Sequence, residues 1–132
     1  MAQLTEKARR RLSDPNLGFL ATIMKDGSPQ VSPIWVDVDG DDIVFNTAKG
    51  RTKERNMRRD PRVAISIADK DDPYTKVDIR GRVVDWVEGD EADAHIDKLA
   101  QKYLGKEKYP GHKQGEERVI VKVEPETISE RG

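Results

Sequence analysis

Seven basic side chains and only two acidic ones fall in one short stretch of the chain, Lys49 to Arg62. The stretch follows an apolar segment at 43–45, turns at Gly50 and then predicts a short helix that ends before Pro61, because the residue before proline disfavours helical geometry. Free backbone N–H groups at a helix N-terminus, with cations nearby, favour an anion such as phosphate. The alternatives are a solvated basic helix or a nucleic-acid patch, since charge runs are usually solvated.

Other arrangements of catalytic residues are missing. The chain has no cysteine, which excludes disulfides and thiolate chemistry. His95 and His112 have neither metal-ligand spacing nor partners for a catalytic triad, so we expect both histidines to be solvated. Ser32 and Ser66 lack the glycine context of a nucleophilic serine. If the protein is an enzyme, a bound cofactor is expected to carry the chemistry.

Composition narrows the class of protein. The chain has 132 residues, 37% charged and 35% hydrophobic, with a net charge of −1. This length predicts a single domain, residues 1–132, with a lean core that favours a homodimer. A net charge near zero argues against a dedicated nucleic-acid-binding protein. No apolar run reaches membrane-spanning length and no signal-peptide core is present, so we expect a cytoplasmic protein with no membrane span.

Periodicity predicts the elements that must position these residues. Helices are expected over residues 4–12, within the basic stretch and over 90–103; strands are expected over 17–24, 29–37, 42–47, 63–68, 75–88 and 118–123. Mostly short turns join the strands, so the pattern predicts a mainly β protein with flanking helices (α+β), built on a six-stranded antiparallel barrel.

Three strands carry further signals. The first strand is almost continuously apolar and is therefore expected to be buried on both faces. Pro29 and Pro33 remove hydrogen-bond donors from the second strand, which places it at an edge or a bulge. Gly81, in the middle of the fifth strand, predicts a sharp bend or bulge.

Several motifs in a fixed order resemble the pyridoxamine 5′-phosphate oxidase-like split-barrel superfamily. They are Leu17–Thr22, Lys25–Pro33, Asn46-Thr47, the Arg51–Val63 segment and Gly81–Val83, and the similarity spans about residues 4–128. Within the superfamily the chain is most similar to the flavin/deazaflavin oxidoreductases of the B type, which use coenzyme F420. The resemblance implies an FMN-binding type of split barrel and a homodimer with cofactor sites at the subunit interface.

The resemblance also implies roles for individual residues. In that family the strand matching 30–36 runs along the flavin or deazaflavin ring, and the lysine matching Lys53, with a basic neighbour matching Arg51, holds the phosphate. The implied cofactor contacts are Gln30, Ser32, Pro33, Ile34, Trp35, Asn46, Thr47, Arg51, Lys53, Asn56 and Lys76. The pyridoxamine oxidases have an arginine where this chain has Thr52, and their substrate-phosphate residues are not recognisable here. Vitamin B6 oxidation is therefore not expected.

Three functional interpretations follow from the resemblance. The first is an F420-dependent reductase that transfers a hydride to a small-molecule acceptor, namely an electron-poor double bond, a quinone or a tetrapyrrole-like compound. The second is an FMN-dependent oxidoreductase on the same barrel. The third is a flavin-binding or haem-like ligand-binding module without catalysis.

Overall fold

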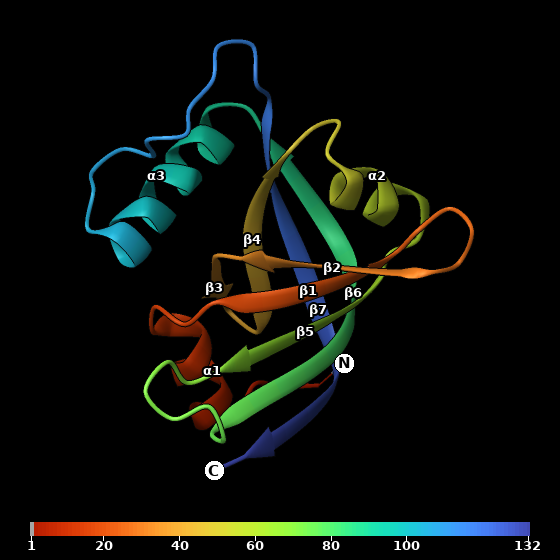
Figure 1. The fold of residues 1–132 in the computed structure, drawn as a ribbon, viewed down its shortest axis with the longest axis vertical. Helices are drawn as coiled ribbons and strands as arrows, with labels where there is room; N and C mark the ends of the chain where they lie inside the picture. The colour runs from red at the N-terminus through yellow and green to blue at the C-terminus, as the bar shows by residue number, and fades with distance from the viewer. Residues whose placement is uncertain (1) are drawn as a thin grey trace.

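Seven strands form one antiparallel sheet in the computed structural model, which describes residues 2–132. The strands are β1 Gly18–Ile23, β2 Pro29–Ile34, β3 Val36–Asp39, β4 Asp42–Ala48, β5 Arg62–Ala68, β6 Lys76–Glu88 and β7 Arg118–Arg131. The helices are α1 Glu6–Ser13, α2 Thr52–Arg59 and α3 Asp90–Leu104. Figure 1 shows α2 and α3 in the upper half of the view on either side of β4, and α1 in the lower half near the C-terminus.

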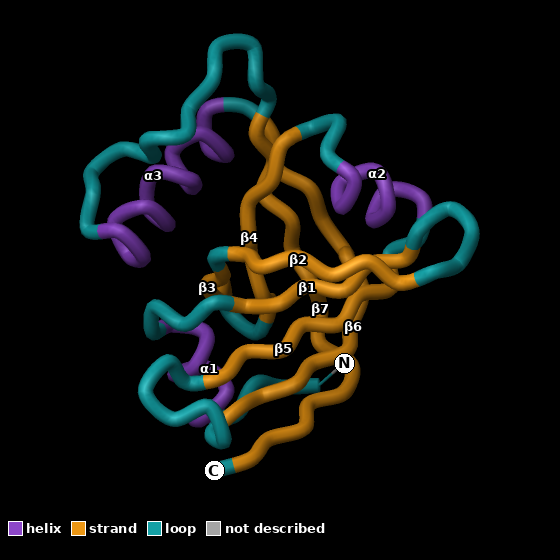
Figure 2. Tube along the Cα trace, in the orientation of Figure 1, coloured by secondary structure: helices purple, strands orange, loops and turns teal. Residues whose placement is uncertain are grey.

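The order of the strands explains why the sheet curls. It is β2-β1-β5-β6-β7-β4-β3, so β2 and β3 are the two outermost strands, yet only Trp35 separates them in the chain. The sheet must therefore roll until its two edges meet at that residue, which gives a barrel that is not fully closed. Figure 2 shows β2 and β3 as consecutive strands joined by this sharp change of direction.

The predicted split-barrel architecture is confirmed, but the count of six strands was wrong. The segment predicted as one strand over 29–37 is two strands, because the chain leaves one edge of the sheet at Ile34 and joins the other edge at Val36. The edge position expected from Pro29 and Pro33 is confirmed, since β2 pairs only with β1.

Gly81 marks the irregularity that was expected in the long strand. The register between β6 and β7 shifts between Arg80 and Gly81. A Cβ atom at Gly81 would lie 2.3 Å from the carbonyl oxygen of Glu124, a distance that no side chain tolerates. The backbones of the two strands thus approach closely where β6 bends, and only glycine permits it.

α3 packs on a separate small apolar cluster with Val44 and Ile120, while the barrel interior and the apolar faces of α1 and α2 form the main apolar core. Its largest fully buried side chains include Phe45, Leu12, Leu20, Ile43, Met57, Ile65, Ile67 and Ile79. The α1 stripe, including Ala8 and Leu12, packs against this core, and the predicted inner face of α3 is buried at Ala92, Ile96, Leu99 and Ala100. The first strand, however, is buried on one face only: Phe19 is 47% exposed, because the outer face of β1 has no covering layer within the chain.

Candidate functional site

A hollow of about 230 Å³ lies where the end of β2, the middle of β4 and the start of α2 meet α3 and the start of β7. We call it the basic hollow. Predicted cofactor contacts that line it are Pro33, Ile34, Trp35, Asn46, Arg51 and Lys53. Its remaining lining residues, which the sequence did not single out as site residues, are Ile96, Leu99, Tyr109 and Arg118.

The charged side chains that line the basic hollow have one sign. Arg51, Lys53 and Arg118 line it, and none of its lining residues within the described chain is acidic. Burial lowers the pKa of the half-buried Lys53, and the positive charges of Arg51 and Arg118 lower it further. Three cations thus line one hollow, while the carboxylate of Glu116, which pairs with Arg118 and Arg51, lies outside the lining. The excess of positive charge is the electrostatic condition for binding an anion.

Other cations of the basic stretch are engaged elsewhere. Lys49 pairs with Glu88, and Arg58 donates to Glu54 at 2.9 Å while its guanidinium lies 3.6 Å from the centre of the Trp86 ring. Of the seven basic residues between Lys49 and Arg62, Arg51 and Lys53 are the two that line the basic hollow.

Local sequence leaves the N-terminus of α2 open toward the basic hollow. Gly50 adopts a positive φ of 92°, which turns the chain from β4 into the helix. Arg51 stands at the N-cap position and makes no side-chain capping bond, while Glu54 reaches back to accept from the Gly50 backbone N–H at 3.0 Å. The backbone N–H groups of the first helical turn have no side-chain cap and are available to an anion.

Arg118 is the most deeply buried cation of the site. It is only 4% exposed, its Nε donates to Glu116 at 3.0 Å and its Nη1 donates to Asn46 Oδ1 at 3.4 Å. The guanidinium lies 4.8 Å from the centre of the Tyr109 ring. Its Nη2 has no hydrogen-bond partner in the part of the chain that the structure describes. The one feature of the sequence that could have drawn attention to Arg118 is that it directly precedes the apolar run 119–121.

Asn46 links this arginine to α3. Its Nδ2 donates to the Ala92 carbonyl at 2.9 Å and lies 3.1 Å from Nδ1 of His95. Because Asn46 is the donor, His95 accepts at Nδ1 and is neutral, and burial lowers its pKa to about 4. The expectation that His95 is solvated was therefore wrong; the apolar face of α3 carries the ring into the protein.

Aromatic rings form the opposite wall. Trp35 stacks on Tyr103 with centroids 5.4 Å apart and meets Tyr109 edge-on at 5.9 Å. Asp97 on α3 fixes the loop that carries Tyr109, accepting from the Tyr109 backbone N–H at 2.8 Å and lying 2.9 Å from His112 Nε2. The wall is thus held from both α3 and the loop, and it offers a flat apolar surface beside the cations.

The remaining predicted contacts do not line the basic hollow. Asn56 is 2% exposed and donates to Thr22 Oγ1 at 3.0 Å, which ties α2 to β1. Gln30 also bonds to Thr22, at 3.1 Å. Lys76 pairs with Asp78 and lies beside α1 and the C-terminal strand. Ser32 and Thr47 have buried hydroxyl oxygens without partners among the described residues.

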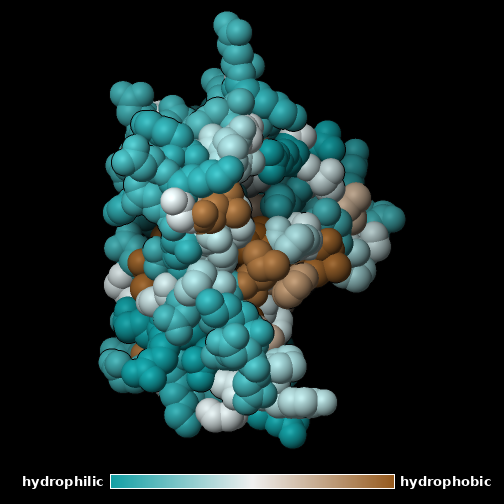
Figure 3. Space-filling view, turned by 60° about the vertical axis from the view of Figure 1, so that its left-hand side comes forward, coloured by the Kyte–Doolittle hydropathy of each residue, from teal (hydrophilic) through white to brown (hydrophobic). Residues whose placement is uncertain are grey.

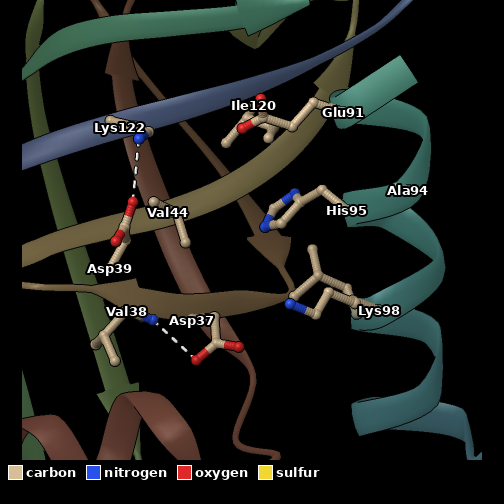
Figure 4. Close-up of a pocket in the computed structure, with 11 residues that line it drawn as sticks. Asp37, Val38, Asp39, Val44, Glu91, Ala94, His95, Lys98, Ile120 and Lys122 are labelled. Atoms are coloured by element: carbon tan, nitrogen blue, oxygen red, sulfur yellow. Dashed lines mark hydrogen bonds and ion pairs between the residues drawn. The ribbon is translucent and has the colours of Figure 1, made fainter. Parts of the chain in front are cut away.

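A larger hollow of about 410 Å³ lies between α3 and the strands β3, β4 and β7 (Figure 4). Figure 4 shows carboxylates and amines facing one another across it. Lys122 donates to Asp39 at 3.0 Å, and Asp37 accepts from the backbone N–H of Val38 at 2.9 Å. Since these charges largely neutralise one another, this hollow is a weaker candidate for an anion than the basic hollow.

Two negative findings limit the chemistry of the described residues, 2–132. They contain no group of three or more histidine, cysteine or carboxylate side chains placed to hold a metal ion. No helix among them is long and apolar enough to cross a membrane.

A rolled antiparallel sheet with open edges and a basic hollow at a helix N-terminus defines the split-barrel class of proteins. Within that class the chain belongs to the pyridoxamine 5′-phosphate oxidase family, whose model matches residues 4–132. This family is of oxidoreductase type, and the resemblance predicted from the sequence motifs is confirmed.

Solved structures support the same assignment. A protein named F420 reductase is 37% identical, with 92% of this chain and 94% of that chain covered and a TM-score of 0.81. A conserved hypothetical protein from Mycobacterium tuberculosis is 25% identical over 99% of this chain and 84% of that chain, with a TM-score of 0.71. A putative pyridoxamine 5′-phosphate oxidase from Listeria innocua shares the fold at 23% identity, with 86% of each chain covered and a TM-score of 0.64.

Proposed function

We propose that this chain is an F420-dependent reductase whose basic hollow holds the phosphate of the cofactor. The observation that carries the proposal is the convergence of Arg51, Lys53 and Arg118 around a hollow without an acidic lining residue. The 37% identity to a protein named F420 reductase favours the deazaflavin cofactor. When bound in its reduced form, F420 supplies a hydride to an electron-poor double bond, a quinone or a tetrapyrrole-like acceptor.

The residues of this chain bind and orient the cofactor. Lys53 and Arg51 hold the phosphate by charge-assisted hydrogen bonds, together with the free backbone N–H groups of the first turn of α2. Trp35 and Tyr109 provide an apolar wall that excludes water from one side. β2 is an edge strand, so the backbone groups on its unpaired side are free to hydrogen-bond a flat heterocycle.

An FMN-dependent oxidoreductase on the same barrel is the second candidate. One observation favours it: three cations and no acidic lining residue suit a phosphomonoester, which carries more negative charge than a phosphodiester. The two candidates therefore share the phosphate site and differ in the ring and in what is attached to the phosphate.

We further propose that the protein is a homodimer and that a second copy covers the outer face of β1, β2 and β5. Phe19 is 47% exposed and Val31 is 65% exposed on this face. Val31 lies opposite Ala21, which in turn lies opposite Ala64, so the exposed apolar side chains are contiguous across three strands. Figure 3 shows apolar atoms gathered in the middle of one face of the molecule, between polar surfaces. An exposed apolar surface of this kind supports the proposed interface.

The proposed activity is tested by mixing the protein with reduced F420 and, in turn, a quinone, an activated enone and a biliverdin-type tetrapyrrole without oxygen. Cofactor oxidation is followed by the recovery of its fluorescence. The proposal predicts protein-dependent oxidation with at least one acceptor class. Binding of F420 without oxidation by any of the three would support a non-catalytic binding module instead.

A further inference from the structure

We propose that Arg118 is a further anion-binding residue of the basic hollow, the buried cation that meets a phosphate group from the β7 side. This inference rests on the proposed phosphate site and extends it to a strand far from α2 in sequence. The predicted contacts Arg51 and Lys53 approach the hollow from the start of α2, and Arg118 lines it from the start of β7, 65 residues after Lys53 in the chain.

The burial of Arg118 is the first step of the argument. A guanidinium has five N–H donors and no acceptor, and burying a donor without a partner costs free energy. Arg118 is 4% exposed; Nε and Nη1 have acceptors, whereas Nη2 has none among the described residues. An oxyanion in the basic hollow is the type of ligand that would satisfy the remaining donors.

The second step is that this arginine is held in place before any ligand binds. Glu116 accepts from its Nε at 3.0 Å and lies 3.6 Å from Nη2 of Arg51, so one carboxylate joins the two arginines. Asn46 accepts from Nη1, and its own orientation is fixed because its Nδ2 donates to the Ala92 carbonyl. A guanidinium fixed from several sides loses little conformational entropy when it binds.

The charge balance identifies the class of ligand. Arg51, Lys53 and Arg118 supply three positive charges, and Glu116, outside the lining, offsets one of them. Two uncompensated positive charges and a planar fork of donors suit a phosphate group, free or esterified. The lowered pKa of Lys53 agrees with this account: burial lowers it most, the nearby arginines lower it further by repelling its charge, and a bound phosphate would offset that repulsion.

The proposal is tested with inorganic phosphate, using chloride at matched ionic strength as the reference. Thermal unfolding at increasing phosphate yields a dissociation constant for the wild-type protein, for Arg118→Met and for the control Arg55→Met. Arg55 is an exposed arginine on α2 that does not line the hollow. We expect the dissociation constant to rise at least about tenfold in Arg118→Met, the usual effect of losing a charged hydrogen bond, and to stay unchanged in Arg55→Met.

An unchanged dissociation constant in Arg118→Met would overturn the proposal, as would a wild-type protein that phosphate does not stabilise. If Arg118→Met does not fold, the wild-type protein provides the readout through the NMR signals of its arginine Nε–H groups. The Arg118 signal is identified by its loss in Arg118→Lys, and the proposal requires that phosphate shift it while the Arg55 signal stays in place. A stationary Arg118 signal would contradict it.

The phosphate experiment tests the role of Arg118 separately from the proposed use of F420. Phosphate binding that depends on Arg118, in a protein that binds neither F420 nor FMN, would support the anion site and refute the proposed function. Tight F420 binding that is equal in wild type and Arg118→Met would support the proposed cofactor and refute the proposed role of Arg118.

Discussion

At the scale of single residues, the contact between Asn46 and His95 sets a protonation state. The Asn46 amide donates to His95 Nδ1 at 3.1 Å, which requires that nitrogen to be unprotonated. Burial lowers the His95 pKa from 6.5 to about 4. Protonation of His95 would therefore break the contact that helps to orient Asn46. The side-chain oxygen of Asn46, which accepts from Arg118, would then be less well positioned.

This pKa predicts a pH dependence of stability. Between pH 6.5 and about 4 the unfolded chain binds a proton at His95 that the folded protein does not, so the free energy of unfolding falls as the pH falls through this window. The full effect is on the order of 3 kcal/mol. Urea unfolding of wild type, His95→Gln and the control His112→Gln at pH 7 and pH 4.5 measures it. An equally steep loss of stability in His95→Gln would contradict the prediction.

The residues of the site differed in how readily the sequence predicted them. Arg51 and Lys53 lie in a conspicuous basic run beside a turn glycine, so composition and the helix signal located them together. Arg118 stands 65 residues after Lys53 and reaches the same hollow only because β7 pairs with β4, with Arg118 opposite Ala48. No local pattern encodes that pairing, so the third cation was missed.

At the scale of elements, most strands and helices followed from periodicity. The exceptions were the break at Trp35 and the last strand, predicted over 118–123, which continues as β7 to Arg131 because its second half pairs with β6. The alternation of apolar residues continues from β2 into β3, so the two strands read as one in the sequence. The switch between sheet edges is a consequence of barrel closure, a global requirement that alternation does not record. That switch is also what brings Trp35 to the wall of the basic hollow.

Gly81 is the element-scale position with the clearest prediction. Gly81→Ala should reduce the free energy of unfolding by roughly 1–3 kcal/mol, because the new Cβ would lie 2.3 Å from the Glu124 carbonyl oxygen and the strands would have to separate. Chemical denaturation of this variant is compared with Val84→Ala, which removes a 47% exposed side chain from the same strand and should change stability little. Equal stabilities of the two variants would refute the predicted close approach.

At the scale of the whole molecule, the uncovered face of β1, β2 and β5 predicts self-association. Val31→Lys places a charge at the most exposed apolar position of that face and should convert a dimer into a monomer in sedimentation velocity experiments. Leu104→Lys, at an exposed apolar position at the end of α3, is the control and should leave the association unchanged. A wild-type protein that sediments as a monomer at high concentration would contradict the proposed dimer.

The central claim is that the basic hollow binds the phosphate of F420. Its most direct test is a titration of the purified protein with F420 and, in parallel, with FMN, at two salt concentrations and repeated with Lys53→Ala. We predict that F420 binds more tightly than FMN, that salt weakens binding, and that Lys53→Ala weakens it by about 1.5–3 kcal/mol. Tighter binding of FMN would move the assignment to the flavin enzyme, and F420 binding that is unaffected by Lys53→Ala would contradict the proposed phosphate site.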